Sequence, residues 1–319
     1  MNRNEARALA SRFAPGVVRA LAVIAVVVAC GLFLRKLDLS SVGSALASAS
    51  LPLVAVAATA NLVQVVVRSR FLQALLAPVR AVGVARLTRY NLAMFAANNL
   101  LPGRAGELLR IRLLKIREGI PASASLAVAL VEKVFDAIAL LLLALPLPLL
   151  LPSLPRSVTV ATLLLGGGGL VALAATFALA RYGELATGRL GRFASGAAVV
   201  RSGRLFGAAL GWALAAHLID AGEIAICLTA MHIHTHPAAP LLVLLALAVA
   251  LAVPSTPGGF GALEMGAVAA LRLLGVEAAP ALAFALVYHA MQVIPVTLLG
   301  LDGMRLGTAM KPAKGASVE

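Results

Sequence analysis

Residues 254–264 read PSTPGGFGALE and interrupt an otherwise apolar stretch that runs from Pro240 to Leu274. A similar interruption lies in the first half of the chain, where residues 101–107 read LPGRAGE inside the apolar stretch Leu87–Lys115. Each arm of these stretches has about 14–16 residues, a helix of about 21–24 Å, which is short for a hydrocarbon core of about 30 Å. Non-helical backbone at membrane depth is tolerated only where protein or a wet cavity surrounds it. We therefore expect two broken, re-entrant helical hairpins.

The composition requires lipid as the solvent. The chain has 319 residues, of which 61% are hydrophobic and 13% are charged, and its mean hydropathy is +0.98. Soluble domains contain roughly 45–50% apolar and about 25% charged residues. The 27 Lys and Arg residues outnumber the 13 Asp and Glu residues, but aromatic residues make up only 4% and apolar segments separate the basic ones. We therefore expect no nucleic-acid partner and assign the basic excess to cytoplasmic loops.

Six further apolar runs are long enough to span a bilayer. They are Val17–Leu34, Leu51–Val67, Pro121–Leu145, Ser157–Ala180, Leu205–Met231 and Ala281–Leu301. The first resembles a signal peptide in its preceding arginines, but it lacks a small-x-small cleavage site, so we expect a retained span. Cys30 and Cys227 each lie within an apolar run and read as small hydrophobic residues. The predicted fold class is an all-α polytopic membrane protein, with about six full spans and two broken hairpins in one domain, residues 1–319.

Positive charge predicts the orientation of this layout. If each hairpin returns to the side it entered from, 22 of the 27 basic residues lie on one side of the membrane. That set places Arg68 and Arg70 in a cytoplasmic loop directly after the span Leu51–Val67. Because Lys and Arg are retained in cytoplasmic loops, we expect both termini in the cytoplasm, with residues 306–319 as a polar tail.

The two interruptions also predict an internal repeat. Both read P-G-x-x-G followed shortly by Glu, and the offset of 155 residues between Pro102 and Pro257 maps Leu51–Val67 onto Phe206–Gly222. The same offset maps Pro121–Leu145 onto Val276–Gly300. A fainter echo, NLVQ at residues 61–64 against HLID at residues 217–220, is one residue out of register. The halves, about 17–156 and 157–305, have opposite orientation, which is the inverted-topology plan of secondary transporters.

Ionisable residues gather around the two interruptions. Each costs about 2.5–3.5 kcal/mol at the centre of a membrane helix on insertion scales, so each needs a partner or a function. The candidates for a polar cavity or a coupling site are Glu132, Lys133, Asp136, His217, Asp220, Glu223, Tyr288 and His289. Alternatively, these charges hold helices together as ion pairs, for example Arg104 with Glu132 or Lys133 with Glu264.

The interruptions themselves predict an anion site. Proline and glycine free backbone N–H groups at the N-terminus of a half-helix, and such a terminus attracts anions. With arginine beside it, a phosphate-bearing lipid headgroup is the expected ligand. The candidate headgroup residues are Gly103, Arg104, Glu107, Arg110, Gly258, Gly259 and Glu264. The alternative is that Pro-Gly marks an ordinary loop.

Two other motifs resemble ligand-binding sites but favour a structural interpretation. His232, His234 and His236 alternate as zinc or copper ligands do, but no carboxylate or cysteine flanks them, so a solvated outer loop is the favoured interpretation. The run Gly166–Gly169 favours close helix packing, because it lacks the Lys and Ser/Thr of a phosphate loop. We expect no metal, no cofactor and no catalytic nucleophile.

Four blocks of the sequence resemble a known family. They are residues 98–110 (NNLLPGRAGELLR), 132–136 (EKVFD), 254–264 (PSTPGGFGALE) and the pair Tyr288-His289. They resemble the transmembrane, flippase-like domain of lysylphosphatidylglycerol synthases and their stand-alone relatives, over about residues 17–305. Lys133 and His289 depart from the family, which usually has arginine at both positions, and this changes the headgroup contacts expected there.

The resemblance implies a lipid translocator in the inner membrane of a bacterium. In two-domain members this region is taken to move an aminoacylated phospholipid across the bilayer, while a soluble domain makes that lipid. The present sequence ends at Glu319, so we expect no aminoacyl transfer and no enzymatic activity. Because stand-alone relatives are associated with lipid-linked sugars and hopanoids, the expected partner is an anionic phospholipid or a lipid-linked glycan. A second copy of the chain or a biosynthetic enzyme is a further candidate partner.

Two other functions stay open at this stage. One is a membrane-embedded transferase or hydrolase that acts on a lipid-linked substrate, with the same carboxylates as general acid and base. The other is a non-catalytic subunit of an envelope lipid biosynthesis complex.

Overall fold

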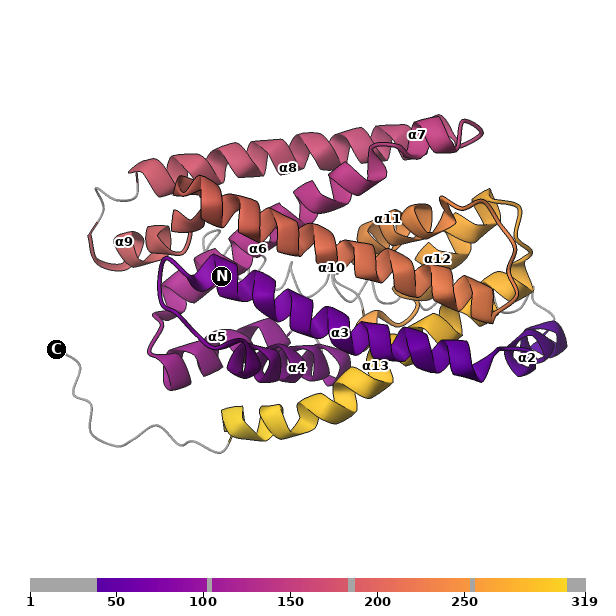
Figure 1. The fold of residues 1–319 in the computed structure, drawn as a ribbon, viewed down its shortest axis with the longest axis horizontal. Coiled ribbons are helices and arrows are strands. Elements are labelled where there is room, and N and C mark those ends of the chain that lie inside the picture. The colour runs from indigo at the N-terminus through magenta and orange to yellow at the C-terminus, as the bar shows by residue number, and fades with distance from the viewer. Residues whose placement is uncertain (1–38, 102–104, 183–186, 253–255, 309–319) are drawn as a thin grey trace, which may run out of the picture.

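The apolar runs of the sequence form helices, and the elements of the described chain are helical throughout (Figure 1). The computed structural model describes residues 39–101, 105–182, 187–252 and 256–308. In chain order the helices are α2 (Leu39–Ala47), α3 (Leu51–Leu76), α4 (Val84–Leu100), α5 (Ala105–Glu118), α6 (Ala122–Ala144), α7 (Leu147–Leu150), α8 (Arg156–Tyr182), α9 (Gly188–Ser195), η3 (Ala198–Arg201), α10 (Gly203–Ala230), α11 (Ala239–Ala252), η4 (Pro257–Gly259), α12 (Ala262–Leu273) and α13 (Ala278–Thr308).

Four of the described helices, α3, α8, α10 and α13, are long and apolar enough to cross a membrane. They contain or closely match four of the six predicted spans. The fifth, α6, has 23 residues, a length of about 35 Å at 1.5 Å per residue, and it carries three charged residues, Glu132, Lys133 and Asp136. The remaining predicted span, Val17–Leu34, lies outside the described residues. The structure adds α2, α7 and α9, which the sequence did not predict.

The outer faces of the bundle are apolar, and several charged side chains are buried inside it beside two apolar clusters. On α8, the side chains of Leu163, Leu164, Leu170 and Val171 are 59–71% exposed. In contrast, Arg110, Glu132 and Glu223 are buried among the helices. A water-soluble protein hides its large apolar side chains and leaves charges in solvent. This reversed distribution, together with the four long apolar helices, identifies a multi-pass membrane protein.

Both interrupted stretches form helical hairpins. Helices α4 and α5 pack against each other, as do α11 and α12. The tip of the second hairpin meets the end of α4 inside the bundle, because η4 packs on α4 and a Cβ added to Gly258 would lie 3.6 Å from the carbonyl oxygen of Asn99. The second interruption is therefore brought next to the end of α4, from which the first interruption starts. That the hairpins re-enter the membrane from opposite sides stays a prediction.

The order of long helix, hairpin and long helix occurs twice, as α3, α4–α5 and α6 and then as α10, α11–α12 and α13. Helices α3 and α10 lie side by side and antiparallel (Figure 1). At one end the backbone N–H of Ser50, just before α3, donates to the carbonyl of Ala230 at the end of α10, at 2.8 Å. An inverted repeat places corresponding helices in opposite directions in this way. The repeat itself stays a prediction.

Basic residues of the described chain concentrate at one end of the bundle, the left-hand end in Figure 1. The connections between α3 and α4, α5 and α6, and α8 and α10 lie at that end. They and the adjoining helix ends carry Arg80, Arg86, Arg89, Lys115, Arg117, Arg181, Arg192, Arg201 and Arg204. The opposite end holds Arg156 and Arg272. This separation fits the predicted orientation, in which the basic end faces the cytoplasm.

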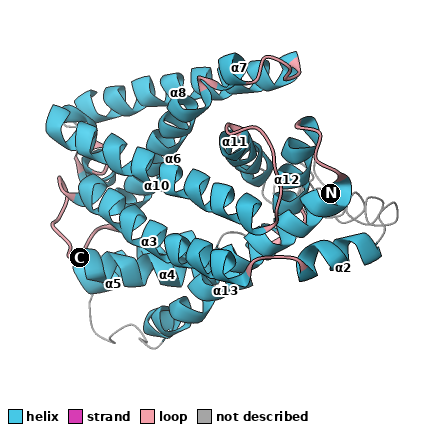
Figure 2. Ribbon diagram, turned by 45° about the vertical axis from the view of Figure 1, so that its right-hand side comes forward, coloured by secondary structure: helices cyan, strands magenta, loops and turns pink. Residues whose placement is uncertain are grey.

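Helix α8 lies on the opposite side of the bundle from α13 and packs along α6 (Figure 2). A Cβ added to Gly166 would lie 2.6 Å from the Cδ1 atom of Leu141, and one added to Gly169 would lie 3.7 Å from the Cβ of Ala137. The interpretation of the glycine run as a close-packing surface is therefore confirmed for these two glycines. Gly167 and Gly168 face open space.

Gly106 sets the distance between the two arms of the first hairpin. A Cβ at this position would lie 1.9 Å from the carbonyl oxygen of Met94 and 2.7 Å from the Oδ1 atom of Asn98. Because the first of these atoms is backbone, α4 and α5 would have to separate. We expect Gly106→Ala to lower the free energy of unfolding by about 1–3 kcal/mol, the usual cost of overpacking.

The measurement is the unfolding midpoint of the purified protein in detergent. Gly167→Ala is the matched control, since nothing lies within 4 Å of its added Cβ. We expect the control to be neutral or stabilising, because alanine is favoured over glycine in a helix by about 0.5–1 kcal/mol. Equal midpoints for the two variants would show that the arms are not packed at Gly106 as described.

Candidate functional site

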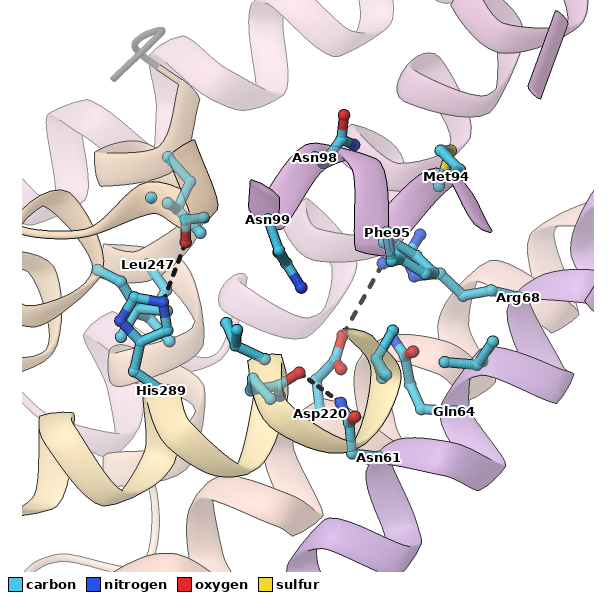
Figure 3. Close-up of a pocket in the computed structure, with 18 of the residues that line it drawn as sticks. Asn61, Gln64, Arg68, Met94, Phe95, Asn98, Asn99, Asp220, Leu247 and His289 are labelled. Atoms are coloured by element: carbon cyan, nitrogen blue, oxygen red, sulfur yellow. Dashed lines mark hydrogen bonds and ion pairs between the residues drawn. The ribbon is translucent and has the colours of Figure 1, made fainter. Parts of the chain in front are cut away.

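A cavity of about 430 Å³ lies inside the bundle where the hairpin tips meet the long helices. Figure 3 shows His289 and Arg68 on opposite sides of it, with the side chain of Asn99 extending between them. Ligand pockets in proteins measure about 300–1,000 Å³, so the cavity has room for a polar headgroup. The predicted site residues that line it are Glu107, Arg110, Glu132, Lys133, Asp136, His217, Asp220, Gly258, Gly259, Tyr288 and His289.

Arg68 joins two carboxylates of different helices. Its Nη1 atom donates to the Oδ1 atom of Asp136 on α6 at 2.9 Å, and its Nη2 atom lies 3.9 Å from the Oδ2 atom of Asp220 on α10. His217 lies between the same two carboxylates, with its ring nitrogens 3.5 Å from each. One arginine of α3 thus holds α6 and α10 together across the cavity wall.

A second ion pair links the first hairpin to α6. The guanidinium of Arg110 binds the carboxylate of Glu132 through two N–H groups, at 2.6 and 3.4 Å. The Nη1 atom of Arg110 also donates to the Oδ1 atom of Asn91, at 3.1 Å. Both charged side chains are almost fully buried, and Arg110 is only 3% exposed. Glu132 thus pairs with Arg110, while Arg104, which the sequence offered as an alternative partner for Glu132, lies outside the described residues.

Lys133 connects the two ion pairs. Its Nζ atom lies 3.9 Å from the Oε1 atom of Glu107 and 3.9 Å from the Oδ2 atom of Asp136. Glu107 in turn lies 3.9 Å from Arg110. The result is a chain of alternating charges, which we call the charge ladder: Glu132, Arg110, Glu107, Lys133, Asp136, Arg68 and Asp220.

Lys133 is the most exposed cation of the charge ladder and the one with the longest distances to its nearest carboxylates. Its side chain is 54% exposed, and its nearest carboxylate oxygens lie beyond the roughly 3.2 Å reach of an N–H···O hydrogen bond. Its donors are therefore available to an incoming anion. Arg68 and Arg110, in contrast, each already donate to a carboxylate at 2.9 Å or less.

The second hairpin places a shared proton against the cavity. The Nε2 atom of His289 lies 3.0 Å from the carbonyl oxygen of Gly258, and its Nδ1 atom lies 2.6 Å from the Oε1 atom of Glu264. Because a carbonyl only accepts hydrogen bonds, Nε2 carries a hydrogen, and a second proton lies between Nδ1 and the carboxylate. The predicted pair of Lys133 with Glu264 is therefore wrong, since Glu264 binds His289.

Three side chains from two helices enclose Glu223. The Nε2 atom of Gln292 donates to the Oε2 atom of Glu223 at 2.8 Å and contacts the hydroxyl oxygen of Tyr288 at 2.9 Å. The side-chain amide of Asn61 on α3 donates to the Oε1 atom of Gln292. Glu223 and Glu264 thus lie behind the cavity wall rather than in it.

The half-helix N-termini are capped by the protein's own side chains. The backbone N–H of Gly106, in the first turn of α5, donates to the Oδ1 atom of Asn98 at 2.9 Å. The backbone N–H of Gly261, which precedes α12, donates to the Oε2 atom of Glu264 at 2.7 Å. Each cap satisfies one of the N–H groups that the sequence analysis assigned to an anion. Side-chain cations therefore carry more of the predicted anion site than helix termini do.

Glycine is required in the second tip, where Gly258, Gly259 and Gly261 have φ values of 67°, 77° and 84°. L-residues with a Cβ rarely adopt this left-handed region. Gly258 and Gly259 both border the cavity, as the headgroup hypothesis requires. Gly103 and Arg104, the corresponding candidates of the first tip, lie outside the described residues.

Arg68 and its neighbours on α3 were not predicted as site residues. The prediction that this span ends at Val67 and that Arg68 lies in a cytoplasmic loop is wrong, because α3 continues to Leu76. Asn61, Gln64 and Arg68 follow one another at spacings of three and four residues, so they share a helix face, and all three line the cavity. That polar stripe in an apolar helix was the available signal. Asn98, Asn99 and Gln292 were also missed as cavity residues.

The three alternating histidines lie away from the cavity. His232, His234 and His236 occupy the connection between α10 and α11, and all three are exposed. The Nδ1 atom of His236 accepts a hydrogen bond from the backbone N–H of Ala238 at 3.1 Å. Their exposure fits the interpretation as a solvated loop.

Comparison with known proteins agrees with this architecture. No curated protein matches the chain. The family model described as the lysylphosphatidylglycerol synthase TM region matches residues 17–300. That span includes both hairpins, all seven members of the charge ladder and the His289–Glu264 pair. The chain is therefore a multi-pass membrane protein that belongs to the lysylphosphatidylglycerol synthase TM region family.

Proposed function

We propose that this protein is a lipid translocator of a bacterial inner membrane. It moves a phosphate-bearing or lipid-linked polar headgroup across the bilayer through the cavity between the two hairpin tips, while the acyl or prenyl chains stay in the lipid. It catalyses no covalent step. The observation that carries the proposal is a cavity of about 430 Å³ inside a bundle whose outer faces are apolar. Charged and amide side chains line this cavity together with apolar ones.

The arrangement of the cavity supports a transport role. Secondary transporters place their sites where discontinuous helices meet near the middle of the membrane, and both interruptions of this chain contribute to one cavity. The two hairpins would enter the membrane from opposite sides, so that each tip faces a different leaflet's headgroups. The inverted repeat and the cytoplasmic termini belong to this proposal. The antiparallel α3–α10 pair supports the repeat, and the basic residues at one end of the bundle support the position of the termini.

Cations set the headgroup preference. We assign phosphate contact to Lys133, which is exposed to the cavity and lacks a close carboxylate, and to Arg104 in the first tip. We assign Arg110 to positioning the hairpin rather than to binding the headgroup, because Glu132 neutralises its charge and, with Asn91, binds its two terminal nitrogens. Hydroxyl or amine groups of the headgroup would meet Glu107, Asn98 and Asn99, whose side chains border the same cavity.

The test is translocation by the purified protein in liposomes that carry headgroup-labelled anionic lipids. A membrane-impermeant quencher reaches the outer leaflet only, so quenching well beyond half of the label reports transbilayer movement. We expect Lys133→Gln and Arg104→Ala each to slow translocation by about tenfold or more, since a hydrogen bond to a charged group contributes about 1.5–3 kcal/mol. Lys115→Gln is the matched control, because Lys115 is an exposed lysine of α5 that does not border the cavity.

Three results would contradict the proposal. If quenching stops at half of the label for several anionic lipids, the assignment as a lipid translocator is wrong. If Lys133→Gln and Arg104→Ala both translocate lipid at the wild-type rate, these two residues do not bind the headgroup. A change in the mass of the added lipid, measured on the same liposomes, would instead favour the transferase or hydrolase.

A further inference from the structure

Glu223 lies in the second half of α10, directly behind the cavity wall. It is 0% exposed, and three of its neighbours, Asn61, Tyr288 and Gln292, line the cavity in front of it. Its Oε2 atom accepts one hydrogen bond, from Gln292 at 2.8 Å. Its Oε1 atom has no hydrogen-bond partner in the described part of the chain.

Glu223 also differs from the other acidic residues around the cavity in its charge balance. Glu107, Glu132, Asp136 and Asp220 belong to the charge ladder, and Glu264 binds His289. Among the described residues, no lysine, arginine or histidine nitrogen lies within 4.0 Å of Glu223. Burying an ionised carboxylate without a cation is costly, and such a group takes up a proton instead.

The groups that face Glu223 from each packed helix agree with a neutral acid. On α10 itself, Asp220 lies nearly one turn before it and Cys227 about one turn after it. Asp220 is an acid, and its charge opposes a second negative charge nearby. Tyr288 and Gln292 of α13 are uncharged partners, and α11 contains no titratable residue. The titratable residues of α6, which also packs on α10, are Glu132, Lys133 and Asp136, all members of the charge ladder.

The nearest fixed cation does not alter this balance. Helix α3 contributes the neutral amide of Asn61 next to Glu223 and the guanidinium of Arg68 two turns later. Arg68 donates to Asp136 at 2.9 Å and lies 3.9 Å from Asp220. Its charge is therefore engaged by two other carboxylates.

We propose that Glu223 is a proton-binding site that couples lipid translocation to a transmembrane proton gradient, an inference that rests on the proposed translocator. In the present conformation a proton is bonded to one carboxylate oxygen of Glu223. When α3 and α13 separate from α10, water solvates the carboxylate, the O–H bond breaks and the proton passes to a water molecule. Binding is the reverse, and no other covalent bond changes.

Asn61 and Gln292 connect the proton to the headgroup. They hydrogen-bond to each other, both border the cavity, and Gln292 also donates to Glu223. A headgroup that draws the Gln292 amide toward itself removes the donor from Glu223 and thereby changes the affinity for the proton. By thermodynamic reciprocity, protonation of Glu223 changes the affinity for the headgroup by the same factor.

The first experiment measures the leaflet distribution of labelled anionic lipid in liposomes, with and without a gradient of one pH unit. One proton per lipid can drive at most about a tenfold difference between the leaflets, since each pH unit corresponds to a factor of ten. We expect an asymmetric distribution for the wild-type protein and an even one for Glu223→Gln.

Glu118→Gln is the matched control, because Glu118 is a buried glutamate outside the cavity that binds Arg86 at 3.0 Å and Tyr90 at 2.7 Å. It should keep the asymmetric distribution. The unfolding midpoint of each variant in detergent checks that the fold persists.

The second experiment reads the proton directly and needs no transport. Infrared spectra of the purified protein at neutral pH should contain a carbonyl stretch of a protonated carboxylic acid that is lost in Glu223→Gln and kept in Glu118→Gln. If no such band depends on Glu223, its carboxylate is ionised and the inference is overturned, whether or not lipid moves.

The remaining outcomes separate the two proposals. A Glu223-dependent band without lipid movement would overturn the translocator and leave the proton site standing. Lipid movement that no gradient biases, in a protein that shows the band, would overturn the coupling.

Discussion

Replacing Arg68 with alanine is expected to abolish most lipid translocation and to lower the free energy of unfolding by about 3–5 kcal/mol, the cost of removing one member of a buried ion pair. The substitution leaves the carboxylates of Asp136 and Asp220 without a fixed charge between them. Only His217, 3.5 Å from each, remains to separate them. Both the position of α10 against α6 and the electrostatic balance of the cavity would change, and the liposome quenching assay measures the consequence.

Two further variants separate charge from geometry at this position. Arg68→Lys keeps the positive charge, but one ammonium cannot reproduce the two guanidinium nitrogens that point toward separate carboxylates, so we expect a partial loss. Arg68→Ala combined with Asp136→Asn removes one charge of each sign. We expect this double variant to regain most of the unfolding midpoint but not the translocation rate.

Arg70→Ala is the control for Arg68. Arg70 lies two residues further along α3, is exposed, and contacts Gln73 rather than the cavity. We expect near wild-type translocation from it. Wild-type rates in Arg68→Ala as well would mean that the charge ladder has no part in transport.

The hairpins and the position of the polar cavity were predictable from the sequence. Proline and glycine inside apolar stretches have one physical consequence at membrane depth, namely backbone groups that need protein or water as partners. The residues 101–107 and 254–264 therefore indicated both the interruptions and the place where they meet. Two of the sequence blocks that resemble the lysylphosphatidylglycerol synthase family, residues 98–110 and 254–264, include the same segments.

Arg68 was not predictable by the same reasoning. A hydropathy criterion treats an arginine after an apolar run as the end of the span, whereas α3 continues through Arg68 because that face of the helix borders a polar cavity. The spacing of Asn61, Gln64 and Arg68 indicates a polar face of one continuous helix. It shows that Arg68 belongs to this face only when the carboxylates that pair with Arg68 are known.

The ion pairs were beyond sequence reasoning for a different reason. Arg110 contacts Glu132, and Glu264 contacts His289, through the packing of separate helices, and the partners are 22 and 25 positions apart in the sequence. Six acidic and three fixed basic side chains allow many pairings of similar chemistry. Only the crossing of the helices selects among them.

Breaking the Arg110–Glu132 pair is expected to be the most destabilising change in the cavity. Both side chains are almost fully buried, and the shorter of their two contacts is 2.6 Å. Arg110→Ala or Glu132→Ala should each lower the free energy of unfolding by about 3–5 kcal/mol, because the remaining charge stays buried without its partner. Chemical unfolding in detergent measures this loss.

The double variant decides what the pair does. Replacing Arg110 and Glu132 together with methionine removes both charges and keeps apolar volume, and such replacements of buried pairs are often neutral or stabilising. If the pair only holds α5 against α6, the double variant should regain both stability and translocation. If Arg110 instead contacts the headgroup phosphate, stability should return while translocation stays low. We expect the first result, because Glu132 neutralises Arg110 and, with Asn91, binds its two terminal nitrogens. That result would leave Lys133 and Arg104 as the cations that the lipid contacts.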